Sequence, residues 1–458
     1  AVKPDTAGVR VLSIDGGGTR GRAPLEFLQA LQDRLGLPYP LQRNFDLIYG
    51  TSSGAIIAAV LYAHNWRIED CTKYFQFRYS SESLEIILQK TLGSRSIMAF
   101  PCAAAFGTKL GIPVTTIRDA TACVFTSYIG IASDYHILKP SGGMGQIPLW
   151  EIVRCSTAAP YYFKPRHIMG LGTFQDGGLM LNNPASIALE ETTAIFPLSA
   201  EPSLVVSLGT GSAKPRSPTT VDPPHFFHDS FPARVYRAFW NSSSSRRAWQ
   251  QLMNHKKLGD SSEFFRFDLE FEGNGPGLDN VSEMEEVGRL ARESIETSPT
   301  LPKLVQHIRA QLFVFELSST PITYCDGRLQ CRGPILCRLA FSTKELKVFL
   351  SQLQNKSASL RIINKALPHC FQDPIPQQAG IGFCMEVQFT VASRTEPFSI
   401  VLCEEEGTEC NISGSPFTLQ SLIRQQNMES WFGTADHRKR RLEASYEGGR
   451  GKRARFYS

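Results

Sequence analysis

The 458-residue sequence predicts an α/β fold with a mostly parallel central sheet flanked by helices, followed by a smaller β-rich C-terminal domain. Two observations predict this fold class. Short apolar runs alternate with helical patterns over the first 212 residues, as in chains that build a parallel sheet. After Ser319 the pattern changes to short strand-like runs separated by turn residues, which favours a β-rich or α+β unit.

The first elements follow one another as strand, helix, strand and helix. Val9–Ile14 is an apolar run typical of a buried parallel strand. Pro24–Leu35 carries leucines at helical spacing and is closed by Gly36, which is a common helix stop signal. Phe45–Tyr49 is predicted to be a short strand, and the Ala-rich Ser53–Ala63 a buried helix.

The alternation continues to residue 208. Asn183 followed by Pro184 is a regular start signal for a further helix. The other expected elements are a strand around Val124–Ile129, a helix over Leu149–Thr157, a strand-like segment Gly172–Gln175 and a buried strand Leu204–Leu208. Ser282–Leu317 is expected to be largely helical. The strand-like runs of the C-terminal region are Gly333–Phe341, Gly382–Val391, Phe398–Cys403 and Pro416–Leu422.

The net charge of +5 comes from the end of the chain. Arg438–Arg455 holds eight basic and two acidic residues, so its local charge is +6 and the remainder carries −1. No nucleic-acid surface is therefore expected on the body of the protein. No run of about eighteen apolar residues predicts a transmembrane helix. The eleven cysteines are scattered and follow no zinc pattern, which favours reduced thiols in an intracellular protein.

Two glycine-rich turns point to chemistry. Asp15–Gly21 (DGGGTRG) follows the first strand and offers a row of backbone N–H groups that could hold an anion. Gly50–Gly54 (GTSSG) follows the second strand and has the G-x-S-x-G spacing of a nucleophile elbow, which exposes a serine at a strand-to-helix corner. Ser52 is therefore the candidate nucleophile of an acyl-transfer site.

Two alternatives concern these turns and the base that a serine needs. Gly16, Gly18 and Gly21 also fit a dinucleotide fingerprint, but the acidic residue this requires at the end of the next strand is missing. None of the nine histidines stands out as a base. Asp176 is a better candidate, because it ends a strand-like segment and is followed by Gly177 and Gly178, which let a neighbouring backbone come close.

In this order, the segments Asp15–Gly21, Gly50–Gly54 and Asp176–Gly178 resemble the patatin-like phospholipases. The resemblance extends to Ser156–Phe163 (STAAPYYF), Asn182–Pro184 and Ser207–Gly211. It covers residues 9–212 and, less closely, the chain to about residue 315. One departure is Ala55, where plant patatins typically carry another glycine. The combination with a C-terminal accessory region is similar to fungal patatin-like proteins.

The resemblance implies a Ser–Asp dyad in which Ser52 is the nucleophile and Asp176 the general base. It assigns the oxyanion hole to the backbone N–H groups of Gly16, Gly17 and Gly18. The supporting residues are Arg20, Gly50, Gly54, Gly177 and Gly178. No metal and no cofactor are expected, since the developing charge lies on one oxygen that N–H donors can hold.

The implied activity is that of a calcium-independent serine lipid acyl hydrolase of the phospholipase or lysophospholipase type, acting in lipid breakdown. An acyltransferase using the same acyl-enzyme, or a non-catalytic lipid-binding signalling module, are the alternatives. The expected partner is phospholipid or another acyl lipid, with peripheral membrane contact as an option; protein partners stay open. We expect an intracellular, cytoplasmic location, and the basic clusters Arg438–Arg441 and Lys452–Arg455 leave a nuclear one open.

We divide the chain into four parts on these grounds. Residues 9–212 form the patatin-like catalytic core, and residues 213–318 complete the catalytic domain with helices. Residues 319–433 form a β-rich accessory domain. Residues 434–458 are charged and contain glycine, which is typical of a disordered basic tail.

Overall fold

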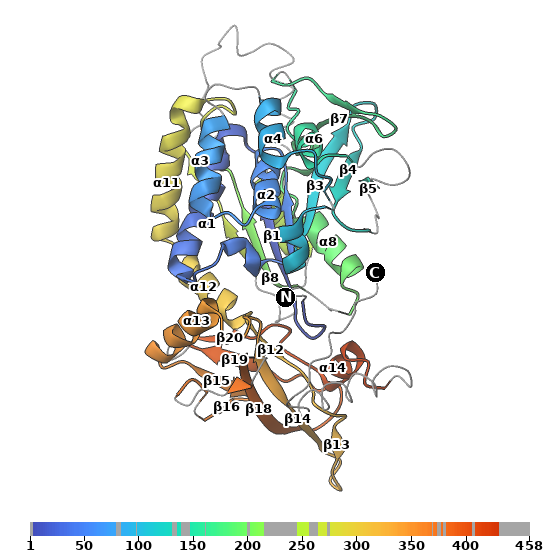
Figure 1. The fold of residues 1–458 in the computed structure, drawn as a ribbon, viewed down its shortest axis with the longest axis vertical. Coiled ribbons are helices and arrows are strands. Elements are labelled where there is room, and N and C mark those ends of the chain that lie inside the picture. Colours follow the sequence, from blue (N-terminus) through green and yellow to red (C-terminus); the bar gives the residue numbers. More distant parts are fainter. Residues whose placement is uncertain are drawn as a thin grey trace, which may run out of the picture.

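The computed structural model consists of a larger α/β part and a smaller β-rich part. In Figure 1 the α/β part is at the top and the β-rich part lies below it. The structure describes residues 3–78, 84–97, 99–130, 135–138, 147–160, 162–198, 202–214, 245–255, 264–272, 275–368, 370–372, 377–378, 382–404 and 408–429. The predicted basic tail, residues 434–458, lies outside these residues.

The α/β part is built on a nine-stranded sheet in the order β10-β8-β1-β2-β3-β4-β5, with β7 pairing β3 and β6 pairing β7. Its pairs β10–β8, β8–β1, β1–β2, β2–β3 and β4–β5 are parallel, whereas β4 and β7 run antiparallel to β3. The strands are β1 (Val9–Ile14), β2 (Leu47–Gly50), β3 (Lys109–Thr116), β4 (Ala122–Thr126), β5 (His136–Leu138), β6 (Arg166–Ile168), β7 (Gly172–Asp176), β8 (Pro202–Leu208) and β10 (Phe264–Phe267).

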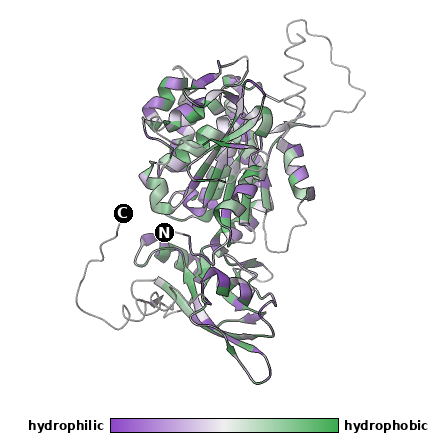
Figure 2. Ribbon diagram, turned by 90° about the vertical axis from the view of Figure 1, so that its right-hand side faces the viewer, coloured by the Kyte–Doolittle hydropathy of each residue, from purple (hydrophilic) through white to green (hydrophobic). Residues whose placement is uncertain are grey.

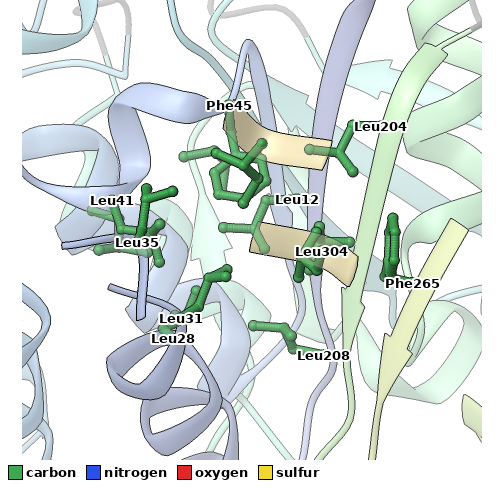
Figure 3. Packing of buried hydrophobic residues seen from close by; sticks show 14 of the residues in the cluster. Leu12, Leu28, Leu31, Leu35, Leu41, Phe45, Leu204, Leu208, Phe265 and Leu304 are labelled. Atoms are coloured by element: carbon green, nitrogen blue, oxygen red, sulfur yellow. The ribbon is translucent and has the colours of Figure 1, made fainter. Parts of the chain in front are cut away.

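Side chains along a strand alternate between the two faces of the sheet, and both faces are buried here, so each central strand contributes to two cores. In β1, Leu12 and Ile14 belong to the core under the helices that follow β1 and β2, whereas Val9 and Val11 pack with Ile187 on the other face. Figure 3 shows the first of these cores, where leucines of the helix after β1 meet Leu12, Leu204 and Leu208 of the central strands. Apolar residues therefore run continuously along these strands, as in Figure 2.

Helices cover both faces of the sheet. On one face α1 (Arg22–Leu35) packs against α3 (Ile68–Arg78), α11 (Met284–Glu296) and α12 (Thr300–Ala310), and α2 (Ser53–Ala63) lies on β2 and β3. On the other face α8 (Ala185–Ile195) lies on β1, β2 and β8, and α10 (Ser245–His255) packs against α8. The shorter elements are η1 (Gly18–Gly21), η2 (Leu41–Asn44), α4 (Leu84–Leu92), α5 (Pro101–Phe106), α6 (Leu149–Ser156), α7 (Gly178–Leu181), β9 (Ser212–Ala213), β11 (Glu270–Phe271) and η3 (Val281–Glu283).

The C-terminal part contains two antiparallel sheets, in the orders β12-β14-β18-β17, with β13 on β14, and β16-β15-β19-β20. Its elements are β12 (Phe313–Phe315), β13 (Ile322–Thr323), β14 (Leu329–Cys337), α13 (Lys344–Asn355), β15 (Ser359–Ile362), β16 (Lys365–Ala366), β17 (Gln377–Gln378), β18 (Gly382–Val391), β19 (Ile400–Cys403), β20 (Glu409–Asn411) and α14 (Leu419–Gln425). The predicted β-rich character of this region is confirmed.

Three details differ from the sequence-based expectations. Pro416–Leu422, expected as a strand, leads into helix α14, where Thr418 and Ser421 form a capping box that fixes the helix start. Residues 213–318 contain helices α10, α11 and α12, as expected, but they also supply the edge strand β10. Phe313–Phe315, inside the same range, pairs with β14 and so belongs to the C-terminal sheet. Because strand pairing needs partners distant in sequence, local periodicity does not reveal it.

Buried ion pairs join the two parts. Asp46, just before β2, forms ion pairs with Arg10 of β1 and with Arg338, which directly follows β14. Although burial alone would raise it, these two guanidinium groups hold the pKa of Asp46 well below its ordinary value. Arg309 of α12 contacts Glu404 after β19, with Nη1 2.7 Å from Oε2 and both side chains buried.

Candidate active site

Ser52 stands at a sharp corner between β2 and α2. Its backbone has φ 54° and ψ −119°, a conformation that is strained for a non-glycine residue and typical of a nucleophile elbow. The corner is possible because Gly54 lacks a side chain: a Cβ there would overlap the carbonyl oxygens of Ile14 and Asp15 at the end of β1. Gly50 is the last residue of β2 and is equally enclosed by the first turn of α2.

Asp176 meets Ser52 from the end of β7. The Ser52 hydroxyl donates a hydrogen bond to Oδ2 of Asp176 at 2.7 Å, and the carboxylate is fully buried. β7 places it there by pairing Asp176 with Val114 of β3, the strand next to β2. The two residues that the sequence singled out as nucleophile and base, 124 positions apart, therefore lie in direct contact.

Two backbone features hold the Asp176 carboxylate. The Gly178 N–H donates to Oδ1 at 2.7 Å, so each carboxylate oxygen has one donor. Gly177 lies against the Pro113 carbonyl, where a Cβ would not fit. Burial raises the pKa of Asp176 to about 7, although the bonds from Gly178 and Ser52 act against it. A pKa near neutrality suits a general base.

Ser156, at the end of α6, fixes the elbow from behind. Its hydroxyl accepts a hydrogen bond from the Ser52 N–H at 3.1 Å and donates one to the Pro113 carbonyl at 2.7 Å. The sequence presented Ser156 only as part of a matching motif. Its role comes from the three-dimensional contact between α6, β3 and the turn after β2, and the residue pattern around it carries no signal of that contact.

The glycine loop after β1 does not present its three amides equally. The Gly16 N–H donates to the Asn182 carbonyl at 3.2 Å, and the Gly17 N–H donates to the Ser53 hydroxyl at 3.0 Å. Gly18, with φ 58°, lines the pocket beside Ser52. Within the described part of the chain no acceptor is found for the Gly18 N–H, nor for the Ser53 N–H at the start of α2.

An arginine from outside the predicted motifs supports this loop. Arg266 of β10 donates through Nη2 to Asp15 at 2.6 Å and to Asp268 at 2.7 Å, and through Nη1 to the Ser207 hydroxyl at 2.7 Å. Although burial would lower it, the two carboxylates raise the pKa of the Arg266 guanidinium. Arg20 makes a longer contact, with Nη1 3.5 Å from the Gly211 carbonyl.

Ser52 and Asp176 open into a pocket of about 160 Å³. Its apolar wall consists of Leu84, Ala159, Tyr162, Phe163 and Leu278, and its remaining lining is Gly18, Ser52, Ser53, Thr157, Asp176 and Asp279. Thr19 ties the Leu278 side of the wall to the glycine loop, since its N–H donates to the Leu278 carbonyl at 2.8 Å. The pocket therefore offers an apolar surface next to a serine hydroxyl and unpaired amides.

His64, at the end of α2, contacts the Thr91 carbonyl with Nε2 at 3.1 Å, so its ring is engaged away from the dyad. No group of three or more His, Cys, Asp or Glu side chains among the described residues is arranged to hold a metal ion. All eleven cysteines are free thiols. In the same described ranges, no helix has the length and apolar character needed to cross a bilayer.

Comparisons with known proteins complete this description. Residues 12–189 match the family model of the patatin-like phospholipases. Calcium-independent phospholipase A2-gamma of Homo sapiens is 33% identical over 235 residues, which cover 44% of this chain and 28% of that protein. Patatin-like protein 2 of Arabidopsis thaliana is 29% identical over 265 residues, covering 46% of this chain and 63% of that protein.

The solved structure of VipD from Legionella pneumophila aligns with 63% of this chain, over 67% of that chain, with 14% sequence identity and a TM-score of 0.32. The chain spans 28% of the length of the human relative it matches, and the matches to named relatives cover less than half of this chain. The family-model match, residues 12–189, contains both Ser52 and Asp176.

Proposed function

From the premise that residues 12–189 form a patatin-like phospholipase domain, we propose that the chain is a serine lipid acyl hydrolase with a Ser52–Asp176 dyad. The observation that carries the proposal is the 2.7 Å hydrogen bond from the Ser52 hydroxyl to the buried Asp176 carboxylate. A serine needs a base within such a distance to become a nucleophile. Relatives named as phospholipases A2 indicate phospholipid as the substrate.

The reaction follows from this geometry. Ser52 Oγ attacks the ester carbonyl carbon, and its proton passes to Asp176 Oδ2. The tetrahedral intermediate collapses, the bond to the alcohol oxygen breaks, and the leaving alcohol takes the proton from Asp176. Water then attacks the acyl-enzyme, gives its proton to Asp176, and releases the fatty acid as Ser52 recovers the proton.

The oxyanion is best held by the Gly18 and Ser53 amides. Both residues line the pocket beside Ser52, and both N–H groups lack an acceptor among the described residues. Ser53 also lies at the positive end of α2. This assignment keeps one glycine of the three expected from the sequence and gives Gly16 and Gly17 the task of holding the loop. Removing one such donor typically costs about 10²–10³ in kcat.

A fluorophosphonate probe tests the nucleophile. We expect labelling of Ser52, located by peptide mapping, and no labelling of the Ser52→Ala variant. Ser52→Ala and Asp176→Asn should each abolish hydrolysis of a short-chain soluble ester, and the double variant should be no worse, because the two groups act as a unit. Labelling at another serine, or an Asp176→Asn variant that hydrolyses the ester at the wild-type rate, would refute the assignment of Ser52 and Asp176 as the dyad.

Three further measurements separate this function from its alternatives. Ester hydrolysis should survive an excess of chelator and a His64→Gln substitution, since neither metal nor imidazole enters the proposed steps. A competing alcohol added to the assay reports acyl transfer as an alkyl ester product. A chain that is folded but shows no Ser52-dependent turnover of any ester would instead be a lipid-binding module.

A further inference from the structure

The hairpin formed by β6 and β7 ends in two exposed apolar side chains. The strands pair antiparallel with Ile168 opposite Gly172, and the turn between them consists of Met169, Gly170 and Leu171. Met169 is 80% exposed and Leu171 37% exposed. Water-facing apolar side chains at the tip of a hairpin contribute nothing to the core, so their place calls for another explanation.

The tip lies on the same side of the molecule as the pocket mouth. β7 runs antiparallel to β3, and Phe174 pairs with Thr116 at the carboxyl end of β3. Gly172 and the turn before it therefore extend beyond the carboxyl edge of the parallel strands, the edge at which Ser52 and the glycine loop follow β2 and β1 (Figure 1). At about 3.3 Å per residue, Gly172 is roughly 13 Å along the strand from Asp176.

Exposed apolar side chains continue from the tip to the pocket. Tyr162 and Phe163, which precede β6, line the pocket and are 43% and 40% exposed. Ile117 is 44% exposed and lies beside the hairpin, since its N–H donates to the Thr173 carbonyl. Of the large apolar side chains that are exposed among the described residues, eight lie on segments that line or adjoin the pocket: Ile86, Ile117, Tyr162, Phe163, Met169, Leu171, Met180 and Val281.

Basic side chains accompany this apolar surface. Lys164, next to Phe163, and Arg118, next to Ile117, are exposed and form no ion pair with another residue that the structure describes. Exposed cations beside apolar and aromatic side chains suit the boundary between lipid headgroups and acyl chains. A protein partner would not require the apolar surface to end at an ester-cleaving pocket, whereas a lipid surface would deliver its own acyl chains there.

We propose that the β6–β7 hairpin inserts Met169 and Leu171 into a lipid surface and seats the mouth of the Ser52 pocket on it. This inference rests on the proposed function, because the surface is the source of the substrate. The hairpin and the base share one strand, so insertion of the tip fixes the distance between the bilayer and Asp176. Buried in the acyl region, each of these side chains contributes to binding in proportion to its apolar area.

The test uses the full chain and vesicles of phosphatidylcholine with phosphatidylserine. Binding is measured by sedimentation in the Ser52→Ala background, which prevents hydrolysis, and turnover of vesicle lipid and of a soluble short-chain ester is measured with Ser52 intact. The variant is Met169→Glu with Leu171→Glu. Its matched control is Ile322→Glu with Tyr324→Glu, two side chains that are 61% and 42% exposed at and beside β13, in another hairpin.

We expect the Met169/Leu171 variant to lose at least tenfold in vesicle binding and in turnover of vesicle lipid, with soluble-ester turnover unchanged. The Ile322/Tyr324 control should match the wild type in all three assays. Equal binding of the hairpin variant and the wild type, an equal loss in the control, or a loss of soluble-ester turnover in the hairpin variant would each overturn the inference. Absence of Ser52-dependent ester turnover in the wild type would instead refute the proposed function.

Discussion

Arg338, at the end of a C-terminal strand, donates to Asp46 at the start of β2, with Nη2 2.9 Å from Oδ1. The two residues are 292 positions apart, and both side chains are less than 10% exposed. Asp46 immediately precedes the strand that carries the Ser52 elbow. Arg338, which follows the C-terminal strand β14, thus neutralises a carboxylate at the start of the strand that leads to Ser52.

Replacing Arg338 should destabilise the whole chain. In Arg338→Met, Asp46 keeps Arg10 but loses the second guanidinium, and we expect a decrease in the free energy of unfolding of about 2 kcal/mol, measured by urea denaturation. The control is Arg332→Met, because Arg332 lies on the same strand in an exposed pair with Glu386 at 3.6 Å. The control should change stability by less than about 0.5 kcal/mol. Equal effects of the two substitutions would contradict a special role for the buried pair.

The pH dependence of ester hydrolysis should report Asp176. The base acts when ionised, and burial raises the pKa of Asp176 to about 7. Activity should therefore be constant above this pH and fall about tenfold per pH unit below it. The measurement is kcat/KM on a soluble ester between pH 5 and 9. A profile that stays flat down to about pH 5 would show that the carboxylate titrates like an ordinary one and would contradict the assignment.

The same group should make the native protein less stable at high pH. Because the pKa of Asp176 is raised in the folded state, the folded chain binds a proton that the unfolded chain loses above pH 3.8, so stability falls as pH rises through about 7. Asp176→Asn removes this dependence and keeps an acceptor for Ser52. We expect the variant to be more stable than wild type at pH 8, by up to roughly 4 kcal/mol. In urea denaturation at pH 4, the variant and the wild type should have almost the same free energy of unfolding. A difference at pH 4 as large as that at pH 8 would show that the raised pKa of Asp176 is not its cause.

Arg266 should position the glycine loop without touching substrate. In Arg266→Met, Asp15 and Asp268 lose their shared cation, and a shift of the loop displaces Gly18 from Ser52. We expect a 10- to 100-fold lower kcat with little change in KM, a slower reaction of Ser52 with fluorophosphonate, and partial recovery in Arg266→Lys. Arg289→Met, in an exposed ion-paired position on α11, is the control. A folded Arg266→Met variant that labels at the wild-type rate would remove Arg266 from the site.

The sequence predicted the site where local chain geometry determines it, and missed it where distant segments meet. Ser52 and Asp176 could be predicted from the sequence because a strained elbow and a close backbone approach both require glycines next to them. These glycines form a recognisable pattern in the sequence. Arg266 and Ser156 act through hydrogen bonds to residues that are distant in sequence, such as Asp15 and Ser52, and the spacing of residues along the chain does not reveal such contacts. The same holds for β12, whose three residues continue a helical region in sequence but pair with β14 in space.

β12 also connects the C-terminal part closely to the α/β part. Only Gln311 and Leu312 separate it from α12, and both are buried. Two buried residues leave little room for a flexible linker, so the connection between α12 and β12 is not exposed to a protease. A chain cut after residue 318 would keep β12 and lose the strand that covers it, which exposes Phe313 and Phe315 to water. The C-terminal sheet is therefore needed to keep these two side chains of β12 out of water.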